Sequence, residues 1–429
     1  MDRAPTPKLG AYAALTAAGL LAALVLGQPA LAVLVAPFGL LLALGLPQAR
    51  DPGVEAVATL GADRTMEGDP VTLTVTVRAR HPVARLEVAV PLPPELEAED
   101  GPPALRLRIG RGDVGPEHGL ERALTLRCRR WGALGVEPVR LRARDHFGFH
   151  EWRAATGRRQ VLRVYPRPAQ LHSLLLPNQT QVHSGNQLAR QRGDGIEFAD
   201  IRPFVPGDRV RRVNWRVSAR RGQPYVNQHH LERNADVILF VDSFAEARTG
   251  REGTLDLTVR LVSALAAGHV ARRDRVGLIG FGGILRWLSP GMGPVHLLRV
   301  VEALLDTEVV LSYAWKGLDI IPPRTLPPQA MVVALTPLLD ARAIGALLDL
   351  RARGFDLAVV EVDPERFVPP ATDPGDRLAD RVWHLHREAR RARLAEAGIP
   401  IARWGPGEPA DQPLTEIAAF RRALRRVPA

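Results

Sequence analysis

The sequence predicts a multi-domain protein: an N-terminal transmembrane helical hairpin, an antiparallel β-sandwich and a doubly wound α/β domain. Three patterns support this. Two apolar runs lie near the N-terminus, apolar and polar residues then alternate with period two, and strands alternate with helices in the C-terminal half. At 429 residues the chain is long enough for several domains. We place the hairpin at 1–50, the β-sandwich at 51–165, a linker and signature segment at 166–235, and the α/β domain at 236–429.

The hairpin is predicted from Leu9–Gly27 and Pro29–Leu46, two apolar runs without a charge. Each is about 18 residues long, near the lower limit for crossing a hydrocarbon core of about 30 Å. The Gly27-Gln28-Pro29 sequence between them is a turn signal. We therefore expect two antiparallel membrane-spanning helices.

The flanking charges predict the orientation of these spans. Arg3 and Lys8 precede the first run, Arg50 follows the second, and the connecting turn is uncharged. By the positive-inside rule, we expect both termini and the soluble domains to lie in the cytoplasm. The alternative is a secretory signal cleaved near Ala30-Leu31-Ala32, which would leave an apolar new N-terminus.

The β-sandwich is predicted from short alternating runs separated by turn residues, as in Val71–Val77 and Leu86–Val90. The Asp145–Gly148 stretch is expected to form a tight turn. The only cysteine, Cys128, falls in one such strand, which excludes an intrachain disulfide and a cysteine-rich zinc site. Residues 166–195 lack periodicity and are expected to be a linker.

The α/β domain is predicted from continuous apolar strands that alternate with amphipathic helices. The expected strands are Asp236–Val241, Arg275–Gly280, Leu285–Leu288, Met331–Thr336, Leu357–Val362 and Ile399–Trp404. Helices are expected at Thr254–Arg273 and Pro294–Asp306, from Asp340 to Gly354, up to Gly398, and at the C-terminus.

Composition and motifs limit the function. The net charge of +11 comes from Arg residues scattered among Asp and Glu, which does not favour nucleic-acid binding. No phosphate-binding loop, His-Glu-x-x-His or Gly-x-Ser-x-Gly motif is present. We therefore expect neither catalytic residues nor a cofactor.

The most distinctive stretch runs from Glu197 to Arg220, with a Pro-Gly-Asp turn and a Trp-x-x-Ser-Ala-Arg end. We select ten residues as a partner-binding or structural signature: Glu197, Arg202, Gly207, Asp208, Arg212, Trp215, Ser218, Ala219, Arg220 and Glu232. Alternation in Val213–Val217 predicts a strand that buries Trp215 against the sheet. Two interpretations stay open, a structural clasp or a docking surface for a protein partner.

This order of residues resembles the signature of family fifty-eight of the domains of unknown function. The resemblance implies a membrane-anchored bacterial protein with a von Willebrand factor A-like domain. It also implies a MoxR-type AAA+ ATPase as the protein partner, in the assembly or maturation of other proteins.

Von Willebrand A-like domains bind Mg²⁺ through an Asp-x-Ser-x-Ser run after the first strand, together with later Thr and Asp residues. This chain keeps Asp242 but has Phe244 and Glu246 at the two hydroxyl positions. Asp340 is the only plausible later carboxylate, and it can equally cap a helix. Since Phe offers no oxygen ligand, we expect no metal site.

The resulting hypothesis is a non-catalytic, membrane-anchored scaffold or adaptor that binds a protein through its A-like domain. The alternatives are a metal-dependent ligand-binding or adhesion module of the cell surface, and a hydrolase without a recognisable motif.

Overall fold

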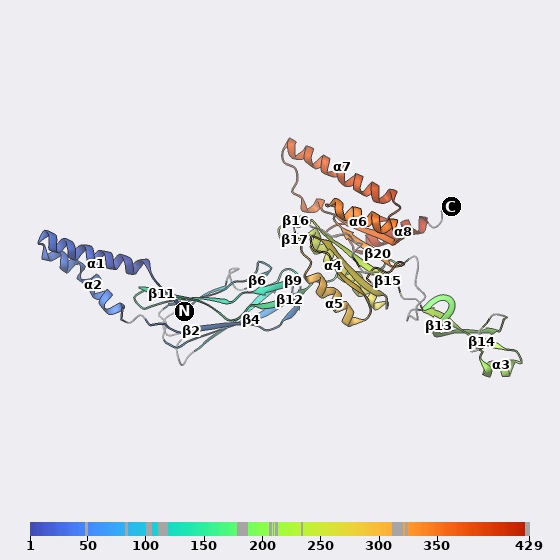
Figure 1. Cartoon of the computed structure of the whole chain (residues 1–429), viewed down its shortest axis with the longest axis horizontal. Helices are drawn as coiled ribbons and strands as arrows, with labels where there is room; N and C mark the ends of the chain where they lie inside the picture. Colours follow the sequence, from blue (N-terminus) through green and yellow to red (C-terminus); the bar gives the residue numbers. More distant parts are fainter. Residues whose placement is uncertain are drawn as a thin grey trace. The chain divides into compact units, whose positions relative to one another are not determined.

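The computed structural model describes most of the chain, in two compact units, Met1–Tyr165 and Pro166–Ala429 (Figure 1). The described residues are 1–47, 50–81, 85–99, 105–109, 119–177, 188–205, 208, 210, 213–232, 235–310, 321 and 325–424. Each unit is considered by itself.

Two apolar helices, α1 (Pro7–Leu26) and α2 (Pro29–Gly45), pack side by side in the first unit. Thr6 caps α1 by accepting a hydrogen bond from the backbone N–H of Leu9, and Gly27 ends it in the left-handed conformation. By length and composition α1 could cross a membrane, whereas α2, with 17 residues, is shorter.

The rest of this unit consists of three sheets, in the strand orders β1-β11-β10-β5-β7, β2-β4-β8-β6 and β3-β12-β9. The first sheet contains β1 (Asp2–Pro5), β11 (His150–Thr156), β10 (Val139–Arg144), β5 (Arg85–Val90) and β7 (Leu105–Ile109). The second contains β2 (Val54–Leu60), β4 (Pro70–Ala79), β8 (Leu120–Cys128) and β6 (Leu96–Ala98). The third contains β3 (Arg64–Met66), β12 (Gln160–Tyr165) and β9 (Gly132–Val136).

These sheets enclose an apolar core to which β4 contributes every second residue, as its period-two sequence predicts. All strand pairs are antiparallel except β3 with β12, which is parallel. Strand β1 was not expected from the sequence. The Asp145–Gly148 turn has the expected form, since Gly148 adopts a φ of 72° and an Asp145 carboxylate oxygen accepts the backbone N–H of Phe149.

The second unit contains a two-stranded antiparallel arm, made of β13 (Leu188–Pro203), α3 (Trp215–Arg221) and β14 (Tyr225–Glu232). Two expectations are wrong here. Strand β13 begins inside the stretch expected to be a linker, and α3 forms where the alternation of Val213–Val217 predicted a strand.

The main body of this unit is a six-stranded sheet in the order β19-β18-β15-β20-β21-β22, parallel except for the edge strand β19. Its strands are β15 (Asp236–Ser243), β18 (Arg275–Gly282), β19 (Arg286–Gly291), β20 (Met331–Thr336), β21 (Asp356–Val362) and β22 (Ile401–Trp404). The order reverses between β15 and β20, as in doubly wound folds, so their carboxyl ends form the crevice where such folds bind ligands.

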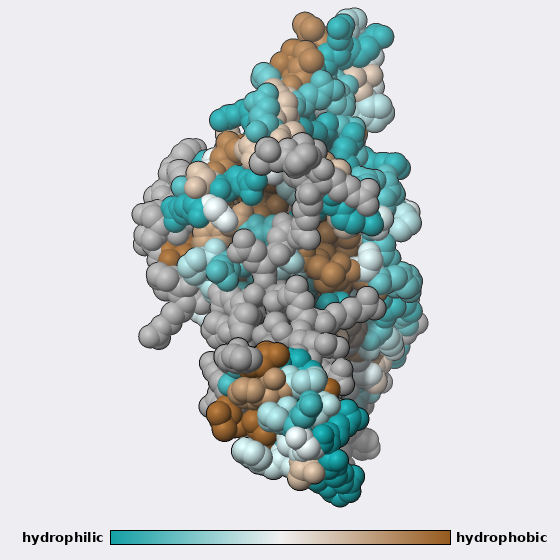
Figure 2. All heavy atoms as spheres, turned by 90° about the vertical axis from the view of Figure 1, so that its right-hand side faces the viewer, coloured by the Kyte–Doolittle hydropathy of each residue, from teal (hydrophilic) through white to brown (hydrophobic). Residues whose placement is uncertain are grey.

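Helices cover both faces of this sheet (Figure 1). They are α4 (Thr254–Ala271), α5 (Pro294–Leu305), α6 (Ala341–Ala352), α7 (Pro374–Glu396) and α8 (Asp411–Leu424). Helices α4 and α5 pack together on one face, and α6 and α7 lie together on the other. Short elements complete the unit: β16 (Arg248–Thr249), β17 (Glu252–Gly253) and a 3₁₀ turn at Glu365–Phe367. At the top of Figure 2, where α7 lies, hydrophobic patches stand among hydrophilic ones.

Candidate functional site

The candidate site lies at the carboxyl ends of β15 and β20, where Asp242 is buried. One carboxylate oxygen of Asp242 accepts the Thr336 hydroxyl at 2.6 Å, and the other accepts the backbone N–H of Phe244 at 3.1 Å. Burial away from water raises the pKa of Asp242 to about 7, although both hydrogen bonds oppose this shift. Asp242 therefore links the end of β20 to the loop after β15, and each of its carboxylate oxygens already accepts a hydrogen bond.

A guanidinium group stands beside this carboxylate. Arg342, in the first turn of α6, bonds both oxygens of Asp340, with its Nε at 2.9 Å and its Nη2 at 2.8 Å. It also lies over the ring of Phe244, 4.0 Å from the ring centroid. Asp340 caps α6 by accepting the backbone N–H of Arg342, and the hydrogen bonds from Arg342 lower the pKa of Asp340.

The loop between β20 and α6 is held in a strained conformation. Leu338 is a buried non-glycine residue with a φ of 53°. Its N–H donates to the Thr336 hydroxyl, and its carbonyl accepts a hydrogen bond from Arg390 on α7. Arg390 also donates to the carbonyl of Leu339. Because the loop is fixed at both ends, Asp340 and Arg342 are presented in one geometry.

These residues do not fit a hexacoordinate Mg²⁺ ion. Phe244 has no oxygen, and its ring packs edge-on against Phe281. Glu246 turns to Arg248, which donates to both of its carboxylate oxygens. Among the residues that the structure describes, no group of three His, Cys, Asp or Glu side chains is arranged to hold a metal. The guanidinium of Arg342 lies at this edge, paired with both oxygens of Asp340.

An apolar groove of about 560 Å³ opens beside this edge. Its size is within the range of ligand-binding clefts. It is lined by the loops after β15, β20 and β21 and by the first half of α7: Ala247, Leu339, Val368, Pro369, Pro370, Ala371, Thr372, Asp376, Ala379, Asp380 and Trp383. The lining is mainly apolar, with two carboxylates on the α7 side.

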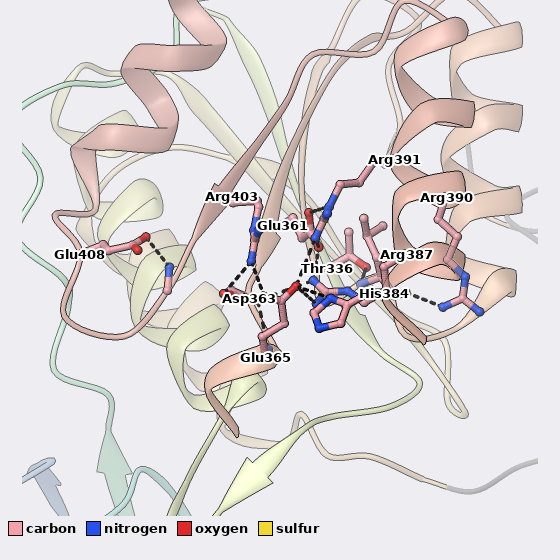
Figure 3. A network of polar contacts seen from close by, with 12 residues as sticks. Thr336, Glu361, Asp363, Glu365, His384, Arg387, Arg390, Arg391, Arg403 and Glu408 are labelled. Carbon is pink, nitrogen blue, oxygen red and sulfur yellow. Dashed lines mark hydrogen bonds and ion pairs between the residues drawn. The ribbon is translucent and has the colours of Figure 1, made fainter. Parts of the chain in front are cut away.

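An ionic network joins α7 to the end of β21 (Figure 3). Glu361 and Arg387 are both fully buried and pair directly, and Arg391 donates to both Glu361 oxygens at 2.5 and 2.8 Å. Arg387 also pairs with Glu365 at 2.8 Å, and Arg403 on β22 bonds Asp363 at 2.9 Å.

We did not anticipate this network from the sequence. A signal was present, because Glu361 interrupts an otherwise apolar strand and a buried carboxylate requires a cationic partner. The sequence does not indicate which of its arginines pairs with Glu361.

The arm contains the signature residues, and two of them pair. The guanidinium of Arg202 donates to both carboxylate oxygens of Asp208, each at 2.6 Å, and the pairing raises the pKa of Arg202. Asp208 also accepts the backbone N–H of Val205. Arg202 and the backbone of Val205 thus hold Asp208 in place, whereas Pro206 and Gly207 of the predicted turn lie outside the described residues.

Ser218 lies at the base of α3. Its hydroxyl donates to the carbonyl of Asn214 and accepts the N–H of Tyr225, thereby joining α3 to β14. Ala219 and Arg220 are exposed on α3. Glu197 and Glu232 lie on β13 and β14.

The expected burial of Trp215 is wrong, since its side chain is 69% exposed at the start of α3. Gly207 and Arg212 lie outside the described residues. A clasp built on a buried Trp215 is therefore not what the arm contains, and Arg202 with Asp208 is the pair that stabilises its turn.

One family model matches part of this chain. The model of the family described as "Protein of unknown function DUF58" matches residues 200–368, from β13 through β21. Uncharacterized proteins of Mycobacterium tuberculosis and Mycobacterium bovis are each 30% identical to this chain over 126 residues. The alignment covers 28% of this chain and 40% of each relative.

Two solved structures each align with about a quarter of the chain. A non-cellulosomal cohesin from Archaeoglobus fulgidus aligns with a TM-score of 0.21 at 13% identity, over 26% of this chain and 91% of that one. The sporulation control protein Spo0M of Bacillus subtilis aligns with a TM-score of 0.16 at 14% identity, over 27% and 50% respectively. Scores this low carry no argument about fold or function.

Proposed function

We propose that this chain is a non-catalytic adaptor anchored in the bacterial cytoplasmic membrane, with a von Willebrand A-like α/β domain that binds another protein. In this proposal α1 and α2 both span the membrane, and both units lie in the cytoplasm. The uncharged turn between the helices and the basic residues outside them support that orientation.

The observation that carries the proposal is the composition of the carboxyl edge of the sheet. Asp242, the carboxylate that would bind a cation, is buried and already accepts two hydrogen bonds. Phe244 and Arg342 stack where further oxygen ligands would be needed. The surface beside them is an apolar groove with carboxylates from Asp376 and Asp380. Such a groove suits a polypeptide segment with aliphatic side chains and a basic residue.

The partner we propose is a MoxR-type AAA+ ATPase, acting with this adaptor in the assembly or maturation of other proteins. This identity rests on the family resemblance, which the match to residues 200–368 supports at the level of the family alone. Nothing in the groove requires ATP or a metal, so the nucleotide chemistry would belong to the partner.

The experiment is a pull-down of the MoxR-type ATPase from the same genome on the full chain in detergent. Val368→Asp should abolish capture, because it replaces an exposed apolar lining residue of the groove with a carboxylate that aliphatic side chains of the partner would have to desolvate. Val295→Asp, at an exposed apolar position on α5, is the matched control. If the Val368→Asp chain still captured the ATPase, the groove would not be the binding surface. If the unmodified chain captured no ATPase, the proposed partner would be wrong.

Calorimetry distinguishes the metal-dependent alternative from the adaptor proposal. Titration of the full chain with MgCl₂ should give no binding heat, whereas a cell-surface module of that kind would bind Mg²⁺. Labelling by a membrane-impermeant reagent should spare both units in intact cells. A saturable Mg²⁺ signal, or labelling of the α/β domain from outside, would contradict the adaptor proposal.

A further inference from the structure

Helix α7 contacts its own domain through a narrow face. Of its 23 residues only Arg387 and Leu394 are buried, and they lie seven positions apart on one side of the helix. Arg387 is held by the network of Figure 3 rather than by apolar packing. The helix is therefore fixed to the domain by the ion pairs of Arg387 and by Leu394, which packs in the apolar core, and most of its surface faces outward.

The outward side carries an apolar row. Leu378, Val382 and Leu385 are 63%, 44% and 61% exposed. Ala389 and Ala392, further along the helix, are also exposed. Steps of four, three, four and three residues separate the five positions, which is the a/d spacing of a coiled coil and spans roughly 21 Å. We call these five residues the α7 seam.

The seam differs from ordinary surface scatter. Single exposed apolar side chains are common and need no explanation. Here five occur in heptad register, with Arg387 and Leu394 at the positions that face away from the seam. The hydrophobic patches at the top of Figure 2 lie on this helix. Since α7 is anchored on one side, its apolar outward side is available to pack against another molecule.

The residues that flank the seam identify what covers it. In the heptad register Arg381 and Glu388 occupy g positions, and His386 and Arg393 occupy e positions. When two copies of α7 align in parallel, Glu388 of each faces Arg393 of the other, which gives two opposite-charge pairs. In an antiparallel pair, where e positions face e positions, His386 and Arg393 would have no acidic partner, although Arg381 would face Glu388. Neither Glu388 nor Arg393 has an ion-pair partner within the described part of the chain.

The residues in the seam favour the same arrangement. Val382 at an a position with Leu378 and Leu385 at d positions is the combination preferred in parallel two-stranded coiled coils. Further along α7, the small side chains of Ala389 and Ala392 would let two paired copies of the helix approach closely. We propose that the α7 seam pairs in parallel with the α7 seam of a second copy of this chain, forming a homodimer.

Two heptads alone form a weak coiled coil. Confinement of both copies to one bilayer raises their effective concentration, which compensates for the short seam; this point rests on the proposed membrane anchor. The dimer itself does not require a particular partner in the groove, because Asp376, Ala379, Asp380 and Trp383 line the groove from another side of α7.

Disulfide cross-linking of the full chain in liposomes tests the proposal, because the only native cysteine, Cys128, is buried. Leu378→Cys and Leu385→Cys, each alone, should form a covalent dimer under mild oxidation, since d positions meet their own copies in a parallel pair. Val295→Cys, exposed on α5, is the collision control. Adding Val382→Glu to the Leu385→Cys chain should abolish the cross-link, and tryptophan fluorescence will show that this exposed substitution leaves the fold intact.

Charge reversal separates pairing from chance proximity. In the Leu385→Cys chain, Glu388→Arg or Arg393→Glu should slow cross-linking about fivefold or more, and the double reversal should restore it. Cross-linking no faster than the Val295→Cys control would overturn the proposal and leave lipid or another protein as the cover of the seam. If the Leu385→Cys chain cross-linked but the Leu378→Cys chain did not, the pairing would be antiparallel, and this result would also overturn the proposal. Loss of ATPase capture with the cross-link intact would count only against the proposed function.

Discussion

The buried pair between Glu361 and Arg387 leads to a quantitative prediction about how α7 is held. Replacing Arg387 with Met keeps an unbranched aliphatic stem but removes the guanidinium and its charge opposite a fully buried carboxylate. Breaking a buried pair in this way costs about 3–5 kcal/mol. We expect the lower end, about 3 kcal/mol, because Arg391 still donates two hydrogen bonds to Glu361.

The double variant Glu361→Leu with Arg387→Met supplies the control. It removes both buried charges, so its loss should be smaller than that of Arg387→Met alone, within about 1 kcal/mol of the unmodified chain. Urea unfolding followed by the fluorescence of Trp383 and Trp404, which flank the network, measures the global effect. Hydrogen exchange of α7 measures its local release.

A loss below about 1 kcal/mol for Arg387→Met would refute this reasoning. It would mean that water reaches Glu361 or that Arg391 alone neutralises it. A double variant less stable than the single would also contradict it, because the apolar pair would then not replace the ionic one.

Three further predictions concern single residues. Because burial raises the pKa of Asp242 from 3.8 to about 7, the folded chain keeps a proton that the unfolded chain loses between these values. Stability should therefore fall as pH rises from 4 to 7, by at most about 1.4 kcal/mol per pH unit, and Asp242→Asn should flatten the dependence of the urea midpoint on pH. Trp215→Ala should change the unfolding free energy by less than about 0.5 kcal/mol, because the side chain is exposed, and a larger loss would show that Trp215 is packed in solution. Burial raises the pKa of Cys128 to about 11, so a thiol reagent at pH 8 should react with it only after unfolding, and rapid reaction of the native chain would contradict its burial.

Much of the fold could be predicted because it follows from short-range patterns. Strand β15 is a continuous apolar run bounded by charged residues, and the structure buries every residue of it. Asp340 lies three residues before a run of apolar positions at helical spacing, and it caps α6. In such segments local sequence and tertiary burial favour the same element.

The prediction for Trp215 was wrong for a local reason that the sequence contained. Val213, Trp215 and Val217 alternate, which indicates a strand, but Asn214 is a strong helix cap and Gly222 is a strong helix stop. Asn214 does accept the N–H of Val217, and Gly222 does adopt a φ of 69°. Three alternating residues were weaker evidence than a matched pair of end signals.

The candidate site could be predicted only in part, because its geometry depends on residues that are distant in sequence. By the resemblance to von Willebrand A-like domains, Phe244 and Glu246 would stand where hydroxyls bind a cation, but the sequence does not indicate that Arg342 lies over Phe244. Arg342 reaches Phe244 from the start of α6, the helix that follows β20. Such a contact depends on the path of the chain, which periodicity does not specify.

The guanidinium of Arg342 at this edge has a consequence for the binding of a partner under the proposed function. A coordinated Mg²⁺ leaves when the ion is depleted, and binding that depends on it is then lost. Arg342 is covalently part of the chain, is held by both oxygens of Asp340, and keeps its charge at every physiological pH. A partner at the neighbouring groove should therefore bind equally well in EDTA and in MgCl₂, once any need of the partner itself for nucleotide and metal has been removed. Binding of the nucleotide-free partner that still requires Mg²⁺ would show that the charge at this edge is not supplied by Arg342.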